Sequence, residues 1–215
     1  MKAVILEKIS RLAENKQPLK VVELPAPVVQ EREILVKVSV CGVCHTELDE
    51  IEGRTPPPEF PVIPGHQVIG VVADRGRLAR KFEIGARVGI GWINSACGRC
   101  PACLAGNENL CGDFKATGRD VNGGYAQYLA IAEDFAFLIP DAFSDVQAAP
   151  LLCAGAIGYR SLRLAGIVNG QSLGLAGFGA SAHLVLKMVR YRYPETEIFV
   201  FARNKDEQNF ARDLG

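Results

Sequence analysis

Apolar and polar side chains alternate over several short stretches of the first part of the chain. Residues 34–40 place Ile34, Val36 and their apolar neighbours on one face, with Lys37 and Ser39 on the other. A period of two residues is typical of a half-buried strand. Residues 68–73 and 86–90 are further strand candidates, rich in β-branched side chains. Many short strands separated by turn signals predict a β-rich, barrel-like domain over residues 1–154.

The pattern changes near Gly155, where a second domain is predicted over residues 155–215. Residues 171–176 predict a buried strand, and residues 197–202 predict another. Between them, residues 180–192 carry apolar side chains at helical spacing, and Pro194 ends the helix. The apolar positions of this helix are Ala180, Leu184, Met188 and Tyr191. A strand, a helix and a strand in this order predict a βαβ unit at the start of an α/β domain.

Composition and charge narrow the classes of partner. The 24 basic residues balance the 24 acidic ones, so no nucleic-acid or anionic-membrane surface is indicated. No apolar run approaches the ~20 residues that span a bilayer, and the start lacks the apolar core of a signal peptide. We therefore expect a cytoplasmic protein with neither nucleic acid nor membrane as a partner. Clustered cysteines in a reducing compartment indicate metal binding or catalysis.

Four cysteines, Cys97, Cys100, Cys103 and Cys111, follow one another with the spacing C-x2-C-x2-C-x7-C. Four thiolates so close together can complete a tetrahedral shell around a structural zinc ion. Two disulfides are disfavoured, because the total of 7 Cys is odd and no signal peptide precedes them. An iron–sulfur cluster is the remaining rival. The sequence thus predicts a structural-zinc lobe at about residues 95–113.

Three further segments, Val40–Thr46, Pro64–Gln67 and Leu152–Gly155, occur in the order found in a known family. Together with the cysteine lobe they resemble the zinc-dependent medium-chain alcohol dehydrogenases, and the resemblance runs along essentially the whole chain. It implies a GroES-like catalytic domain followed by the start of a Rossmann domain. It also implies two zinc ions per chain and hydride transfer between a small alcohol and NAD(P), giving the aldehyde or ketone. Family members of full length imply a homo-oligomer.

The resemblance assigns a catalytic zinc to Cys44, His66 and Cys153, with one position left open for substrate. Cys41 and Cys44 also form a C-x2-C pair, for which a redox motif is the alternative. We interpret Cys41 as a small buried apolar residue. A single histidine such as His66 is otherwise more often structural, but its position after Pro64-Gly65 favours the ligand role.

The same resemblance gives roles to three residues after Cys44. Thr46 aligns with the hydroxyl that bonds the substrate alcohol, and His45 with a contact to the cofactor phosphates. Asp49 stands where many relatives carry a relay histidine. The alternatives are a strand or turn threonine and a plain surface histidine. Two further departures are Glu47 and Gln67, where the family often has aspartate and glutamate; a neutral Gln67 removes one negative charge near the metal.

The substrate pocket is assigned by alignment to Trp92, Ile51 and Thr55. A bulky and largely apolar pocket suits a small primary alcohol or its aldehyde. Core packing is the competing interpretation for Trp92 and Ile51.

Gly177, Gly179 and Ala182 form a G-x-G-x-x-A version of the dinucleotide fingerprint between a predicted strand and a predicted helix. Gly177 allows the tight turn, Gly179 allows close approach of the pyrophosphate, and Ala182 occupies the close-packing position. The second strand ends at Ala202 rather than at an acidic residue, and Arg203 follows. This pair favours NADP over NAD, because an arginine can bind a 2′-phosphate. The alternative is a solvated Arg203 and NAD.

The chain stops shortly after the βαβ start, whereas family members continue with the rest of the nucleotide-binding sheet. We expect a chain truncated within that domain, with little activity as an isolated fragment. Two alternative functions remain. One is a zinc dehydrogenase for a polyol, an amino-acid side chain or an aromatic alcohol, and the other is a zinc-stabilised module without catalysis. Zinc stoichiometry separates the enzyme from the module, since two bound ions support the former.

Overall fold

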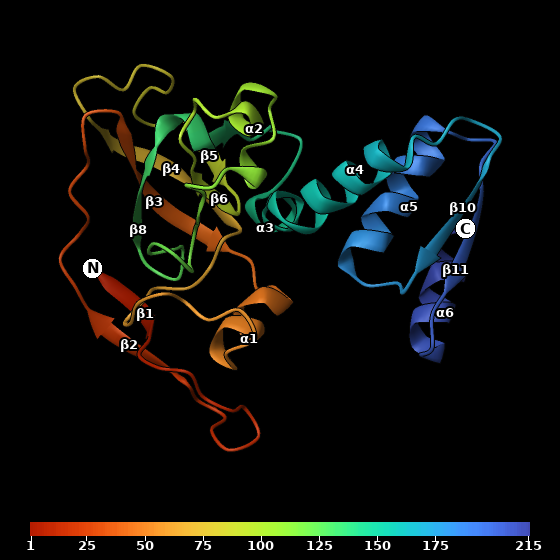
Figure 1. The fold of residues 1–215 in the computed structure, drawn as a ribbon, viewed down its shortest axis with the longest axis horizontal. Helices are drawn as coiled ribbons and strands as arrows, with labels where there is room; N and C mark the ends of the chain where they lie inside the picture. The colour runs from red at the N-terminus through yellow and green to blue at the C-terminus, as the bar shows by residue number, and fades with distance from the viewer. The chain divides into compact units, whose positions relative to one another are not determined.

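The computed structural model describes residues 1–215, which divide into two compact units, Met1–Leu152 and Cys153–Gly215 (Figure 1). The strands of the first unit are β1 (Lys2–Leu6), β2 (Leu19–Glu23), β3 (Glu33–Cys41), β4 (Val68–Arg75), β5 (Arg87–Ile90), β6 (Ile93–Ser95), β7 (Lys115–Ala116), β8 (Tyr128–Ala132) and β9 (Ala136–Leu138). Its helices are α1 (His45–Ile51), α2 (Pro101–Leu104), α3 (Asp145–Ala148) and the 3₁₀ turns η1 (Glu108–Leu110), η2 (Glu133–Phe135) and η3 (Ala149–Leu152).

An antiparallel five-stranded sheet in the order β8-β3-β4-β5-β9 forms the centre of the first unit. The alternation predicted for residues 34–40 is confirmed in β3, where Ile34 and Val36 are fully buried while Lys37 faces solvent. The register shifts between Leu35 and Val36 and again between Val38 and Val40. Such bulges increase the local twist, which suits a sheet that curls around its core. The predicted β-rich architecture of this part of the chain is therefore confirmed.

Two short segments next to this sheet contain most of the predicted metal-binding residues. Helix α1 begins directly after Cys44, at the end of the loop that leaves β3. A strand or turn threonine is the alternative considered for Thr46, but the structure places this residue in a helix. Glu47 caps that helix by accepting a hydrogen bond from the Cys44 backbone N–H at 2.6 Å. The cysteine lobe is bounded by the small β6–β7 pair.

The second unit contains α4 (Ala154–Ala165), β10 (Ser172–Ala176), α5 (Ala180–Arg192), β11 (Glu197–Phe201) and α6 (Lys205–Asp213). Strands β10 and β11 are parallel, with α5 as the crossover, so the predicted βαβ unit is confirmed (Figure 1). No helix of the protein combines the length and the apolar character needed to cross a membrane.

Two details of this unit differ from the prediction. Helix α5 buries Val185, Leu186 and Val189, while Tyr191 is 88% exposed. The buried face is therefore rotated about the helix axis from the apolar face that was predicted. Strand β10 is not buried on both faces. Its side chains alternate between half-buried and exposed, because the helices of this unit cover one face of the two-stranded sheet.

Candidate functional site

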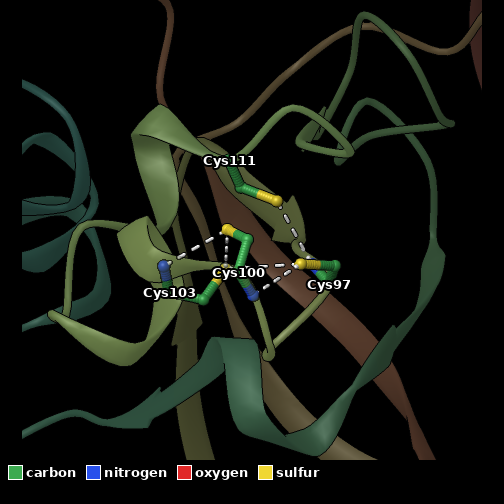
Figure 2. A group of neighbouring side chains, drawn as sticks. All are labelled: Cys97, Cys100, Cys103 and Cys111. Atoms are coloured by element: carbon green, nitrogen blue, oxygen red, sulfur yellow. Dashed lines mark hydrogen bonds between the residues drawn. The ribbon is translucent and has the colours of Figure 1, made fainter.

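The four cysteines of the lobe converge on one point from the loop after β6, from α2 and from the end of η1 (Figure 2). Their sulfur atoms all lie within 4.8 Å of one another, and none is in a disulfide. The Cys97–Cys103 sulfurs are 3.9 Å apart and the Cys100–Cys103 sulfurs 3.5 Å. Four Zn–S bonds of about 2.3 Å define a tetrahedron with edges of about 3.8 Å. The lobe therefore has the donor set and the dimensions of a closed four-cysteine metal shell.

Backbone N–H groups prepare this lobe for negative charge. The Cys100 N–H donates to Cys97 Sγ at 3.3 Å, and the Cys97 and Asp113 N–H groups donate to Cys111 Sγ. Hydrogen bonds from the backbone of Arg99 and Cys100 lower the pKa of the Cys97 thiol to about 6. Desolvation and the neighbouring Cys100 thiol raise the pKa of Cys103 to about 12.

A second cluster joins Cys44, His66 and Cys153, whose ligand atoms also lie within 4.8 Å of one another. Cys44 caps the N-terminus of α1, and His66 follows a glycine with a φ of +98°. A side chain on Gly65 would collide with the Tyr125 ring at 2.6 Å, so only glycine allows this approach. Leu152, directly before Cys153, packs over β5 in the core of the first unit. Cys153 therefore directly follows a residue that is anchored in the core of the first unit.

Glu47 orients the histidine of this cluster. Its Oε1 atom lies 2.7 Å from His66 Nδ1, and both side chains are almost fully buried. Burial alone would lower the pKa of His66, but the hydrogen bonds to Cys44 and Glu47 raise it to about 9. With Nδ1 held by the carboxylate, Nε2 is the nitrogen left for a metal, the arrangement usual for histidine ligands. Two thiols and one oriented imidazole fit a catalytic zinc with an open fourth position.

Of the residues predicted to handle substrate and protons, two lie beside this cluster and two lie toward the surface of α1. Thr46 Oγ1 is 3.5 Å from Cys44 Sγ. The Trp92 ring meets the His66 ring edge-on, with centroids 5.0 Å apart. His45 is largely exposed and lies 3.7 Å from Asp49 Oδ1. Asp49 also forms an ion pair with Arg54, so the structure brings it to the outer surface of α1 rather than to the metal cluster.

Three other predicted residues lie elsewhere or have another role. Ile51 is 4% exposed and packs in the core with Leu6 and Val62, so its assignment to the pocket is corrected to core packing. Thr55 is exposed in the loop after α1. Cys41 stays apart from the cluster, and desolvation raises the pKa of its thiol to about 12. A thiol that ionises so reluctantly argues against a redox pair with Cys44.

The glycine-rich loop occupies the turn from β10 into α5. Gly177 has a φ of +81°, and its N–H donates to Phe201 O at 2.8 Å. Gly179 caps α5, and a Cβ added there would meet nothing within 4 Å, which leaves its backbone accessible. Ala182 packs against the cluster around Phe178. Arg203 is exposed just before α6, next to Ala202.

Sequence reasoning missed two charged residues near the metal cluster. Glu50 lies one turn after Glu47 on α1 and is 1% exposed. Arg119 places its guanidinium 5.7 Å from the centre of the Trp92 ring and donates to both oxygens of Asp120, at 2.9 and 3.0 Å. The i, i+3 spacing of Glu47 and Glu50 was the only signal for the first, and nothing marked the second.

Comparison with known proteins gives consistent results. Residues 30–141 match the family described as the alcohol dehydrogenase GroES-like domain. An alcohol dehydrogenase from Geobacillus stearothermophilus is 36% identical over 94% of this chain and 59% of its own length. A cinnamyl alcohol dehydrogenase from Sorghum bicolor superimposes with a TM-score of 0.86 at 29% identity, over 99% of this chain and 62% of that one.

A third relative is the protein described as CAD from Helicobacter pylori, in a complex with NADP(H). It gives a TM-score of 0.86 at 25% identity, over 100% of this chain and 63% of that chain. The chain therefore spans less than two thirds of the length of the relatives it matches.

Proposed function

The chain belongs to the alcohol dehydrogenase family that carries the GroES-like domain, and we propose that it functions in a zinc-dependent oxidoreductase. The proposed reaction interconverts a small alcohol and its aldehyde or ketone by hydride transfer with NADP or NAD. The observation that carries the proposal is the cluster of Cys44, His66 and Cys153, with His66 oriented by Glu47. A catalytic zinc ion would supply a Lewis acid that makes an alcohol proton easier to lose.

The residues of this chain have distinct parts in the proposed reaction. Cys44, His66 and Cys153 hold the ion, and Glu47 keeps Nε2 of His66 directed at it. Thr46 Oγ1, close to Cys44 Sγ, accepts the hydroxyl proton of the substrate and passes its own onward. Trp92 forms an apolar wall beside His66, which positions the substrate carbon and excludes water.

The four cysteines of the lobe would hold a second, structural zinc ion. Their spacing, their sulfur–sulfur distances and the N–H groups directed at Cys97 and Cys111 support this assignment. Because the shell is complete with protein ligands, this ion has no open position for substrate, and its contribution is to stability.

The turn from β10 into α5 is the proposed dinucleotide site, with the pyrophosphate at the start of α5. Arg203 beside Ala202 favours NADP, because no carboxylate at this strand end repels a 2′-phosphate. The complex of the Helicobacter pylori relative with NADP(H) supports this preference.

A binding experiment tests the proposal. NADPH and NADH are titrated into the zinc-loaded protein, and alcohol and aldehyde turnover is followed by nicotinamide absorbance in a protein that carries these residues with a complete nucleotide-binding domain. Cys44→Ala should abolish turnover and remove one zinc ion per chain. Turnover that survives in Cys44→Ala would contradict the proposed site.

A further inference from the structure

The two buried acids of α1 have opposite surroundings. Glu47 has a close partner for each oxygen: Oε2 accepts from the Cys44 N–H at 2.6 Å, and Oε1 lies 2.7 Å from His66 Nδ1 in an ion pair. Glu50, one turn later and equally inaccessible to water, has no hydrogen-bond partner for either carboxylate oxygen. Buried carboxylates are normally paired or hydrogen-bonded, so an unpartnered one needs an explanation.

Glu50 lies one turn after Glu47 on α1, and both are buried. Burial and the charges of Glu47 and Cys44 raise the pKa of the Glu50 carboxyl to about 8, while His66 and Arg119 lower it. Two of these residues, Cys44 and His66, belong to the proposed catalytic metal cluster. The only positive charges in the set are already engaged, His66 by Glu47 and Arg119 by Asp120. In the metal-free fold, Glu50 is therefore left without a free positive partner, an excess of one negative charge once it ionises.

A divalent cation at the cluster would compensate this excess. From the burial, the missing partners and the shared electrostatic neighbourhood, we infer that Glu50 is a positioning residue for the metal. Its carboxylate strengthens cation binding at Cys44, His66 and Cys153 through its charge, without itself being a ligand. The inference rests on the proposed function, since it presupposes a metal at that cluster. Glu50 lies outside the group whose ligand atoms converge, which agrees with an indirect role.

A purely structural role would have the opposite signature. A carboxylate without partners contributes no hydrogen bond to the fold, so glutamine of the same shape should serve the metal-free protein at least as well. The same substitution should weaken metal binding, because it removes the charge. Metal-free stability and metal affinity are thus expected to change in different directions.

The test compares wild type, Glu50→Gln, Glu52→Gln and Cys44→Ala by zinc competition with a chelator of known affinity. It is run at about pH 8.5, because desolvation and the Glu47 charge raise the pKa of Glu50 to about 8. Cys44→Ala identifies which zinc equivalent belongs to the cluster. Glu52 is the next acidic residue along the chain, and it accepts a hydrogen bond from Arg54, so it is the matched control.

Glu50→Gln should lower the affinity of that equivalent at least about tenfold, or about 1.4 kcal/mol, and leave the other equivalent unchanged. Its metal-free melting temperature should equal or exceed that of wild type, and Glu52→Gln should bind both ions normally. Unchanged affinity in Glu50→Gln, or failure of this variant to fold without metal, would overturn the inference. Wild-type protein that binds only one zinc ion would instead contradict the proposed function.

Discussion

Removal of the Glu47 carboxylate should affect both the fold and the metal. In Glu47→Ala, His66 Nδ1 and the Cys44 N–H lose their partners in a region closed to water. Breaking a buried pair in this way costs about 3–5 kcal/mol, and loss of the helix cap adds about 1 kcal/mol. A total of about 4–6 kcal/mol is a large part of the 5–15 kcal/mol typical of a domain. Zinc affinity at the cluster should fall about 10–100-fold, since the imidazole is no longer oriented.

Glu47→Gln should give an intermediate result for a specific reason. One carboxylate oxygen accepts from the Cys44 N–H and the other forms an ion pair with His66 Nδ1, whereas an amide offers one acceptor and one donor. One N–H is therefore left unsatisfied, at a cost of about 1–3 kcal/mol.

The assays are urea unfolding of the metal-free protein and zinc competition, with Glu133→Ala as the matched control. Glu133 is another buried carboxylate, which accepts from the Arg80 and Lys81 N–H groups. Its removal should lower stability and leave zinc affinity unchanged. Wild-type zinc affinity in Glu47→Ala would refute the role given to Glu47.

Three further predictions test other parts of the account. In a protein that carries these residues with a complete nucleotide-binding domain, Cys44→Ala should abolish turnover with little change in melting temperature, whereas Cys103→Ala should chiefly lower the melting temperature. Equal effects on melting would contradict the division into catalytic and structural ions. In the same completed protein, Ala202→Asp should reverse a preference for NADP(H), changing relative kcat/KM by about tenfold to a hundredfold through roughly 1–3 kcal/mol. A parent protein that already works better with NAD(H) would refute the role of Arg203. The pKa of Glu50 is raised from 4.5 to about 8 in the metal-free fold, first by desolvation and then by Glu47. A raised carboxyl pKa stabilises the fold fully at low pH and loses that contribution as the pH rises through the folded value, so metal-free wild type should lose stability relative to Glu50→Gln between about pH 4.5 and about pH 8 in urea unfolding. A constant difference across that range would show that Glu50 is not desolvated.

The fold could be predicted where one physical pattern dominated. The alternation in residues 34–40 reports a strand with one face on the core, and β3 spans Glu33–Cys41. Strands β1, β2, β8 and β9 were not identified, because they are short and their apolar runs lack clear alternation. Helix α1 was missed because its seven residues are too few for helical periodicity to show. The face of α5 was misjudged because its apolar residues surround more than one side of the helix, and tertiary packing selects among them.

The candidate site shows a similar division. Cysteine spacing was sufficient to bring together Cys97, Cys100, Cys103 and Cys111, since the ligands are close along the chain. The grouping of Cys44, His66 and Cys153 needed the family resemblance, because these residues are far apart in the sequence. Glu50 could not be recognised from the sequence, because the feature that distinguishes it is a buried carboxylate without hydrogen-bond partners, which only the structure shows.

The number of tightly bound zinc ions per chain tests the central claim most directly. The purified wild-type chain, dialysed against a weak chelator and analysed by elemental mass spectrometry, should retain two zinc ions. Cys44→Ala should retain one ion, and the ion that this variant lacks should be the one that wild type gives up first to a stronger chelator. A wild-type chain that retains a single ion, unaffected by Cys44→Ala, would contradict a catalytic metal at Cys44, His66 and Cys153.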